Sequence, residues 1–205
     1  MEWNDRYMTL FRDAVERYHQ HPQTVVERFF LPDELEFLEA IGSGAAEMHA
    51  YVQEYATKGE PSPCTVLLIA AARRSFFLTQ QKGIHGHAKP VRSQDLPPET
   101  AEFQEIAYLP RIISKATAKL YGTLDASVPY YDEKDRQFLR EHGGIHPADF
   151  LYLAWRARGG SDKQRIVMTV LQAMAAQRGS SPVPAPSATP APAAASKPAQ
   201  PELPL

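Results

Sequence analysis

The chain has 205 residues, which is enough for one domain of ordinary size together with a tail. Its 22 lysines and arginines nearly balance 24 aspartates and glutamates, which argues against a protein that binds nucleic acid with its whole surface. The only cysteine, Cys64, excludes an intrachain disulfide and favours a reducing compartment. The first residues lack the apolar core of a signal peptide and no apolar run is long enough to span a bilayer, so we expect a cytoplasmic protein without a membrane segment.

Apolar residues recur at spacings of three and four through most of the first 178 residues, which predicts an all-α, compact bundle of roughly seven to nine helices. The expected helical segments, in chain order, are 5–19, a turn within 24–30, 32–41, 45–56, 63–82, 99–108, 110–121, 132–142, 150–158 and 162–177. Leu35 and Ile166 are predicted to face the core. No pair of strands with the turn residues of a hairpin is evident.

Three stretches between or within these helices stand out. Ser62-Pro63 combines an N-cap residue with proline at the first helical position, so a helix begins there. The residues that follow, 65–78, are apolar on nearly all sides, which predicts a buried central helix. Residues 84–98 read as a loop of a length that is usually functional or disordered.

The C-terminal segment 179–205 is rich in proline and alanine and has almost no bulky apolar residue. Ordering such a segment would cost conformational entropy without compensating burial, so we expect a disordered tail. The predicted organisation is therefore a single helical domain over 1–178 followed by this tail.

Charge is distributed unevenly along the chain. Residues 1–60 hold twelve acidic and five basic residues, whereas residues 61–94 hold five basic residues and no acidic one. This acid-free stretch either meets an anionic partner or faces the acidic N-terminal helices within the fold.

Arg111, Lys115 and Lys119 follow one another at intervals of four and form a basic stripe on the predicted helix 110–121. Arginine makes bidentate contacts to phosphate or carboxylate, and lysine acts as a point charge. The stripe is either an anion-binding surface or a solvated helix face. If the stripe is an anion-binding surface, replacing its three residues with alanine would abolish anion binding without lowering the thermal stability of the protein.

Further basic residues, Arg73, Arg74, Lys89 and Arg92, flank phenylalanines in the acid-free stretch and are candidates for the same anionic partner. Basic and aromatic residues together suit single-stranded nucleic acid. Because the phenylalanines occupy positions that a helix core requires, this stretch does not favour nucleic acid as the partner.

His85 and His87 lie on a glycine-flanked loop and form a weak candidate metal site. Zinc requires three or four ligands, and the chain has neither a cysteine pair nor an HExxH motif. No cofactor is predicted, although a divalent metal stays open. Cys64 is interpreted as a small buried residue rather than as a nucleophile.

Residues 103–158 resemble an uncharacterised family of bacterial helical domains, a domain of unknown function. The resemblance is carried by Tyr-Leu-Pro-Arg-Ile-Ile-x-Lys-Ala at 108–116, by Lys-Leu-x-Gly-Thr-Leu at 119–124, by 135–139 and by 145–151. It implies a small α-helical bacterial domain and no catalytic residue. Residues 1–100 form an N-terminal part outside the resemblance.

Two functions are consistent with these patterns. The first is a non-enzymatic binding module for an acidic protein surface, a phosphorylated metabolite or, less favoured, nucleic acid. The second is a small enzyme of unassigned class in which His85 or His87 acts as acid–base beside Arg111. Whether the protein is an enzyme and which oligomeric state it adopts stay open, but an enzyme needs these residues to converge in a concave site.

Overall fold

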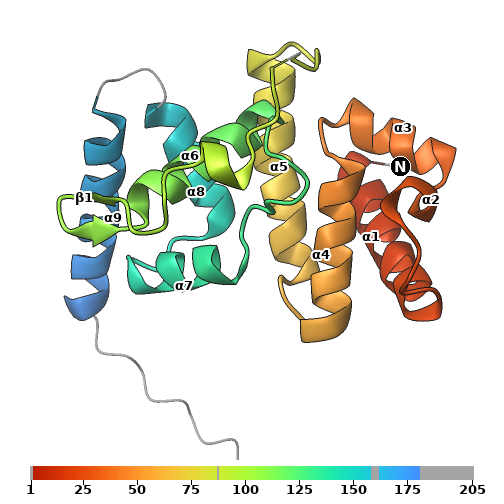
Figure 1. Cartoon of the computed structure of the whole chain (residues 1–205), viewed down its shortest axis with the longest axis horizontal. Helices are drawn as coiled ribbons and strands as arrows, with labels where there is room; N and C mark the ends of the chain where they lie inside the picture. The colour runs from red at the N-terminus through yellow and green to blue at the C-terminus, as the bar shows by residue number, and fades with distance from the viewer. Residues whose placement is uncertain (1, 87, 158–161, 181–205) are drawn as a thin grey trace, which may run out of the picture.

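The computed structural model describes residues 2–86, 88–157 and 162–180, with side chains as far as 176. Most of these residues are helical and the two strands are very short, so the all-α prediction is confirmed (Figure 1). The α-helices are α1 (Trp3–Gln20), α2 (Val26–Phe29), α3 (Pro32–Ala40), α4 (Ala45–Lys58), α5 (Pro63–Gln80), α6 (Leu109–Tyr121), α7 (Glu133–Glu141), α8 (Pro147–Arg156) and α9 (Lys163–Ser180). A short 3-10 helix, η1 (Ser93–Asp95), and two strands, β1 (Glu102–Phe103) and β2 (Ile106–Ala107), complete the fold.

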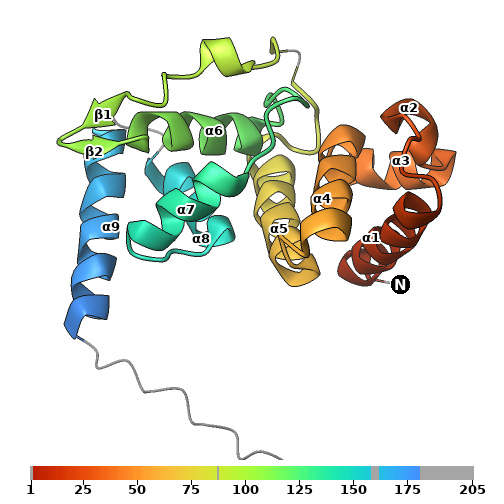
Figure 2. The ribbon, with the colours of Figure 1, turned by 60° about the horizontal axis from the view of Figure 1, so that its bottom comes forward.

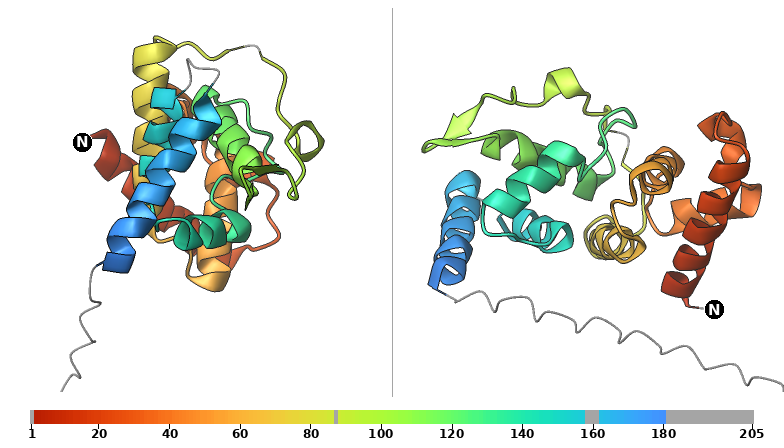
Figure 3. Two further views of the ribbon diagram at one scale, coloured as in Figure 1. Left: turned by 90° about the vertical axis from the view of Figure 1, so that its left-hand side faces the viewer. Right: turned by 90° about the horizontal axis from the view of Figure 1, so that it is seen from below.

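The N-terminal helices α1 to α4 enclose one hydrophobic core. The apolar face of α1, with Tyr7, Leu10 and Phe11, packs against buried residues of α4 such as Met48 and Val52. Arg17 of α1 ties α3 to this core through paired contacts of 2.9 Å to the two carboxylate oxygens of Glu34. These helices lie together at one end of the molecule (Figure 3).

The long helix α5 lies between the two ends of the molecule and contributes to both cores (Figure 1). Val66 and Ala70 belong to the N-terminal core, whereas Ile69, Ala72 and Phe76 belong to the C-terminal core. The helix begins where the sequence predicts, because the Ser62 side chain accepts a hydrogen bond from Thr65 N–H at 3.2 Å. Its burial is incomplete, since Leu68 and Leu78 are 43% and 41% exposed on the open side.

Helices α6 to α9 surround the second core. The buried face of α6, with Ile112, Ala116 and Leu120, packs on α5 and α8, and α9 closes the far end (Figure 3). Gly122 ends α6 with a φ of 68°, a left-handed conformation that favours glycine.

The segment that joins α5 to α6 runs along the outside of α6 toward the hairpin (Figure 2). It is tied down midway, because Val91 donates to Thr123 O at 2.7 Å and accepts from Asp125 N–H at 3.0 Å. The predicted loop therefore has an anchor and one short helix, η1.

The predicted helix at 99–108 is wrong. Glu102–Phe103 and Ile106–Ala107 pair as antiparallel strands, and the two turn residues Gln104 and Glu105 have φ of 48° and 65°. Positive φ at both positions is what a tight two-residue turn requires. The turn escapes prediction because neither residue is the usual glycine or asparagine.

Two core predictions also fail. Leu35 and Ile166 are exposed, and the buried positions in the described parts of their helices are Phe37, Leu38, Val167, Met168 and Leu171. Both residues lie at the edge of the apolar stripe of their helix, and helix periodicity does not by itself place the boundary between the packed side and the open side. The predicted disordered tail lies outside the described residues from position 181 onward.

Candidate anion-binding site

The basic stripe of α6 is buried rather than solvated. Arg111, Lys115 and Lys119 are 9%, 1% and 4% exposed. Arg111 donates to Pro97 O at 2.8 Å and to Ser93 Oγ at 2.9 Å. This arginine therefore holds the 93–97 segment against α6.

Lys115 lies in an internal ion-pair network. Its Nζ atom is 2.6 Å from one carboxylate oxygen of Asp132 and 2.6 Å from one of Asp135. Asp135, which is fully buried, also accepts from Tyr108 Oη at 2.9 Å. Burial raises the pKa of Asp135, and the charge of Lys115 opposes that rise.

Lys119 forms an ion pair with Glu47, which comes from the first turn of α4. Glu47 also accepts from Tyr51 Oη at 3.3 Å. The contact connects the two halves of the molecule, since α4 belongs to the N-terminal core and α6 to the C-terminal core. Burial lowers the pKa of Lys119, against the opposing effect of Glu47.

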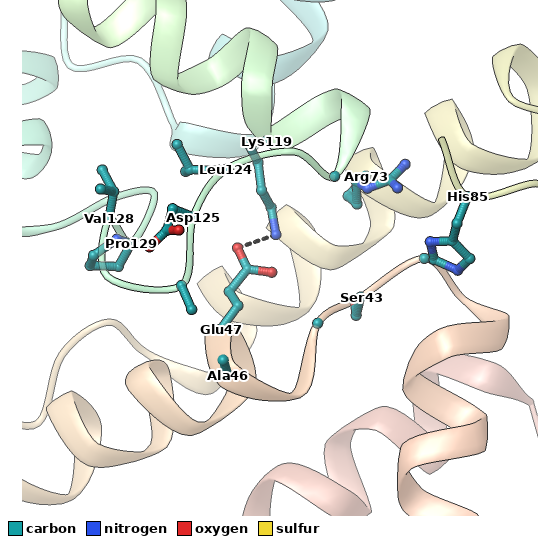
Figure 4. A pocket seen from close by; sticks show the side chains of 14 residues that line it. Ser43, Ala46, Glu47, Arg73, His85, Lys119, Leu124, Asp125, Val128 and Pro129 are labelled. Atoms are coloured by element: carbon teal, nitrogen blue, oxygen red, sulfur yellow. Dashed lines mark hydrogen bonds and ion pairs between the residues drawn. The ribbon is translucent and has the colours of Figure 1, made fainter. Parts of the chain in front are cut away.

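A cavity of about 170 Å³ lies beside this ion pair (Figure 4). Its walls come from five places: the 42–44 corner with the start of α4, the middle of α5, His85 beyond the end of α5, the end of α6, and the 124–129 loop. Figure 4 shows Lys119 and Glu47 pointing toward each other at its centre, with Arg73 on one side and Val128 and Pro129 on the other. The 42–44 corner joins α3 to α4.

Arg73 is the unusual residue of this cavity. Its side chain is 1% exposed, and its Nη1 atom donates to Gln81 Oε1 at 2.7 Å. The Nε and Nη2 atoms are closed to water and have no hydrogen-bond partner among the described residues. No carboxylate of the described chain forms an ion pair with it, and burial lowers the pKa of Arg73 to about 10 against the opposing charge of Glu47.

Local backbone features make room for the Arg73 guanidinium. A Cβ atom on Gly122 would lie 2.5 Å from Nη2, so only glycine fits beside it. The guanidinium also lies over the Phe77 ring, 5.1 Å from its centroid. The C-terminus of α6 lies next to Arg73, and its negative dipole end favours a cation there.

The N-terminus of α4 adds hydrogen-bond donors to the same cavity. Gly44 is the N-cap residue and supplies no side-chain cap, while Ser43 and Ala46 also line the cavity. The first N–H groups of a helix have no intrahelical acceptor and carry the positive end of the dipole. Together with Arg73 and Lys119, this end of α4 gives the cavity three cationic elements.

The other candidates of the acid-free stretch are distributed differently. Arg74, the neighbour of Arg73, lies outside the cavity with its guanidinium 4.9 Å from the Trp3 ring centroid. Lys89 is exposed, and Arg92 is exposed with its Nε atom 3.9 Å from Asp125. Among the predicted anion-binding residues, the structure therefore brings together Arg73 and Lys119.

His85 lines the cavity, whereas His87 lies outside the described residues. The His85 ring packs against Phe77, and its Nε2 atom is 3.0 Å from Glu39 O. Where the chain is described, no three histidine, cysteine, aspartate or glutamate side chains are grouped as a metal site. The convergence of His85 with Arg111 required by the enzyme hypothesis is not observed, because Arg111 contacts the 93–97 segment instead.

Cys64 is exposed, so the prediction of a buried cysteine is wrong. It lies in the first turn of α5 on the side that also exposes Leu68. Sequence reasoning also missed Glu47 and Gly122 as parts of the cavity. The only sequence signals were the Gly42-Ser43-Gly44 corner just before an acidic first turn and the helix-ending glycine after Lys119.

The fold and the cavity define a class: an all-α protein with two hydrophobic cores that share one helix and a small charged cavity between them. Comparison of the chain with family models, with curated proteins and with solved structures gave no match. The resemblance of 103–158 to a bacterial helical family therefore stays a prediction. None of the described helices has the length and apolar character needed to span a membrane.

Proposed function

We propose that this protein is a non-enzymatic binding protein that holds a small anionic ligand in the cavity between Arg73, Lys119 and the N-terminus of α4. The observation that carries the proposal is Arg73, a buried guanidinium without an ion-pair partner in the described chain. Leaving a buried charge uncompensated costs several kcal/mol, roughly 3–5 kcal/mol when a partner is removed. An anion in the cavity would supply the missing charge.

A small ligand is supported over a macromolecular one. Lys115 and Lys119, the lysines of the stripe, are engaged with carboxylates inside the protein. They offer no row of exposed cations for an acidic protein surface or for nucleic acid. A phosphorylated or carboxylated metabolite needs only a few converging donors, as the cavity provides.

An enzyme acting on an anionic substrate is a second candidate, favoured by one observation. His85 lines the same cavity as Arg73, Glu47 and Lys119, so a potential acid–base group lies on the wall. We place binding first because Nε2 of His85 is engaged with Glu39 O and the ring is packed on Phe77.

The proposal is tested by titrating the protein with phosphate, sulfate, acetate and benzoate, using chemical shifts or calorimetry. We expect at least one of these anions to bind, and Arg73→Met to weaken its binding about tenfold or more, because a hydrogen-bonded charge contributes about 1.5–3 kcal/mol. Replacing an unpaired buried charge with an apolar side chain of similar length should not unfold the protein.

Arg74→Met is the matched control, because Arg74 is the next residue of α5 but lies outside the cavity. This variant should bind like the unsubstituted protein. If no anion binds, or if Arg73→Met and Arg74→Met bind equally well, the cavity is not an anion site.

A further inference from the structure

We infer that the ligand is a small monocarboxylic acid, with its carboxylate at Arg73 and an apolar body against the wall formed by Leu124, Val128 and Pro129. The inference rests on the proposed function and adds the chemical class of the ligand. It follows from the net charge of the cavity, the geometry of the unpaired donors and the character of the walls.

The charges on the cavity favour a single negative charge on the ligand. Two cations, Arg73 and Lys119, and two anions, Glu47 and Asp125, line the cavity, and Arg92 beside Asp125 offsets one of the anions, so the lining accommodates a single negative charge. Asp125 is partly exposed, and its carboxylate lies 3.9 Å from Nε of Arg92. Its carboxylate repels a second negative charge, so a dianion such as sulfate fits the cavity less well.

The unpaired donors match a carboxylate. Nε and Nη2 form one edge of the planar guanidinium, and paired N–H groups of this kind bind two oxygens of a carboxylate side by side. The third nitrogen, Nη1, is already bonded to Gln81. Because Nε and Nη2 are closed to water, binding has to be accompanied by a rotation of the guanidinium toward the cavity.

The cavity also has room for an apolar body. A volume of about 170 Å³ is close to that of a cavity that holds benzene. Opposite Arg73, the 124–129 loop presents Leu124, Val128 and Pro129 (Figure 4). An inorganic oxyanion would leave the cavity side of this apolar wall uncovered, whereas an aliphatic or aromatic acid covers it.

The test compares four probes with matched shapes: benzoate, the neutral isostere benzamide, the dianion phthalate, and acetate, which lacks the ring. Binding to the full chain is followed by calorimetry at constant ionic strength. We expect benzoate to bind about tenfold or more tightly than each of the other three. Tighter binding of phosphate or sulfate than of benzoate would overturn the inference and leave the proposed function standing.

Two variants test the contribution of the carboxylate and that of the apolar part of the ligand separately. Arg73→Met should weaken benzoate about tenfold or more and leave the weak binding of benzamide unchanged. Leu124→Ala should weaken benzoate severalfold while leaving acetate unchanged. Equal binding of all probes, or no loss with either variant, would overturn the inference; absence of any anion binding would overturn the proposed function with it.

Discussion

Arg73, Lys115 and Lys119 are all more than nine-tenths buried, but their surroundings compensate their charges to different extents. Lys115 contacts two carboxylates and Lys119 contacts one, whereas among the described residues Arg73 contacts the Gln81 amide, the Phe77 ring and the end of α6 but forms no ion pair with a carboxylate. A buried charge is stable only when it is paired or solvated. The two paired lysines are therefore structural cations, whereas Arg73 is available to a ligand.

Lys115→Met is expected to lower the free energy of unfolding by about 3–5 kcal/mol, because it leaves the fully buried Asp135 without its cation. A solvated stripe would instead tolerate the change. Urea denaturation followed by circular dichroism measures the difference. The double variant with Asp135→Asn should recover part of the loss, and a single variant as stable as the unsubstituted protein would contradict the structural role of the pair.

At the scale of elements, local turn chemistry and long-range contacts compete. The strand pair at 102–107 forms although its turn residues, Gln104 and Glu105, both adopt positive φ. Each left-handed non-glycine residue costs roughly 1–2 kcal/mol. The hairpin persists because its partly buried side chains, Phe103 and Ile106, pack against the C-terminal core.

Replacing the turn by Asn-Gly, as Gln104→Asn with Glu105→Gly, is expected to raise the free energy of unfolding by about 1 kcal/mol, since these residues adopt positive φ readily. Thermal and urea denaturation both report it. The same double change within a helix would be destabilising, so a decrease in stability would favour the helix predicted from sequence at 99–108.

The contact between α1 and α3 gives the fold a pH-dependent contribution. Burial by itself would raise the pKa of Glu34, but hydrogen bonds from Arg17 and from Leu31 N–H outweigh it and lower the pKa below 4.5. A carboxylate with a lowered pKa stabilises the native state above its unfolded pKa, and this stabilisation is lost as pH falls through the folded value.

Glu34→Gln should therefore lower the free energy of unfolding by about 2 kcal/mol near pH 7. The difference in stability between this variant and the unsubstituted protein should shrink as pH falls below 4.5. Urea denaturation at a series of pH values measures this difference. Glu36→Gln, on the same helix and exposed, serves as the control. A Glu34 difference that stays constant down to low pH would show that the ionised carboxylate contributes nothing.

The whole molecule consists of two cores joined by α5 and by polar contacts across the junction. Tyr51 Oη donates to Tyr130 O at 2.8 Å, and Arg136 Nη2 is 2.6 Å from Glu54. The Lys119–Glu47 pair and the candidate cavity lie at the same junction. A ligand bound there would contact both halves, so binding and the coupling of the two cores are linked.

The two tryptophans make this coupling measurable, because Trp3 packs with the N-terminal core and Trp155 with the C-terminal core. In Trp155→Phe and Trp3→Phe variants, the remaining fluorescence should report a single coincident urea transition. Adding Arg136→Ala should lower the free energy of unfolding by about 3 kcal/mol, since it leaves Glu54 without its partner across the junction. It should also separate the urea midpoints reported by the two tryptophans. Midpoints that stay coincident would show that the contact between Arg136 and Glu54 is not needed to couple the two cores.

The sequence by itself determined most helices and their ends, because local signals specify them: Ser62-Pro63 begins α5, Gly59 and Gly122 end α4 and α6, and Asp132 caps α7. It also singled out the basic stripe. Helix propensity, capping and periodicity act within one turn or two, and a sequence displays them directly.

Only the tertiary structure decided what the stripe does. Whether a lysine on a helix meets water or a carboxylate depends on residues that are distant in the chain, and Lys119 meets Glu47 across 72 positions. The same holds for the hairpin, which depends on packing, and for Arg73, which lacks an ion-pair partner among the described residues because of which side chains surround it. Burial and charge pairing arise between elements, so no pattern along the chain records them.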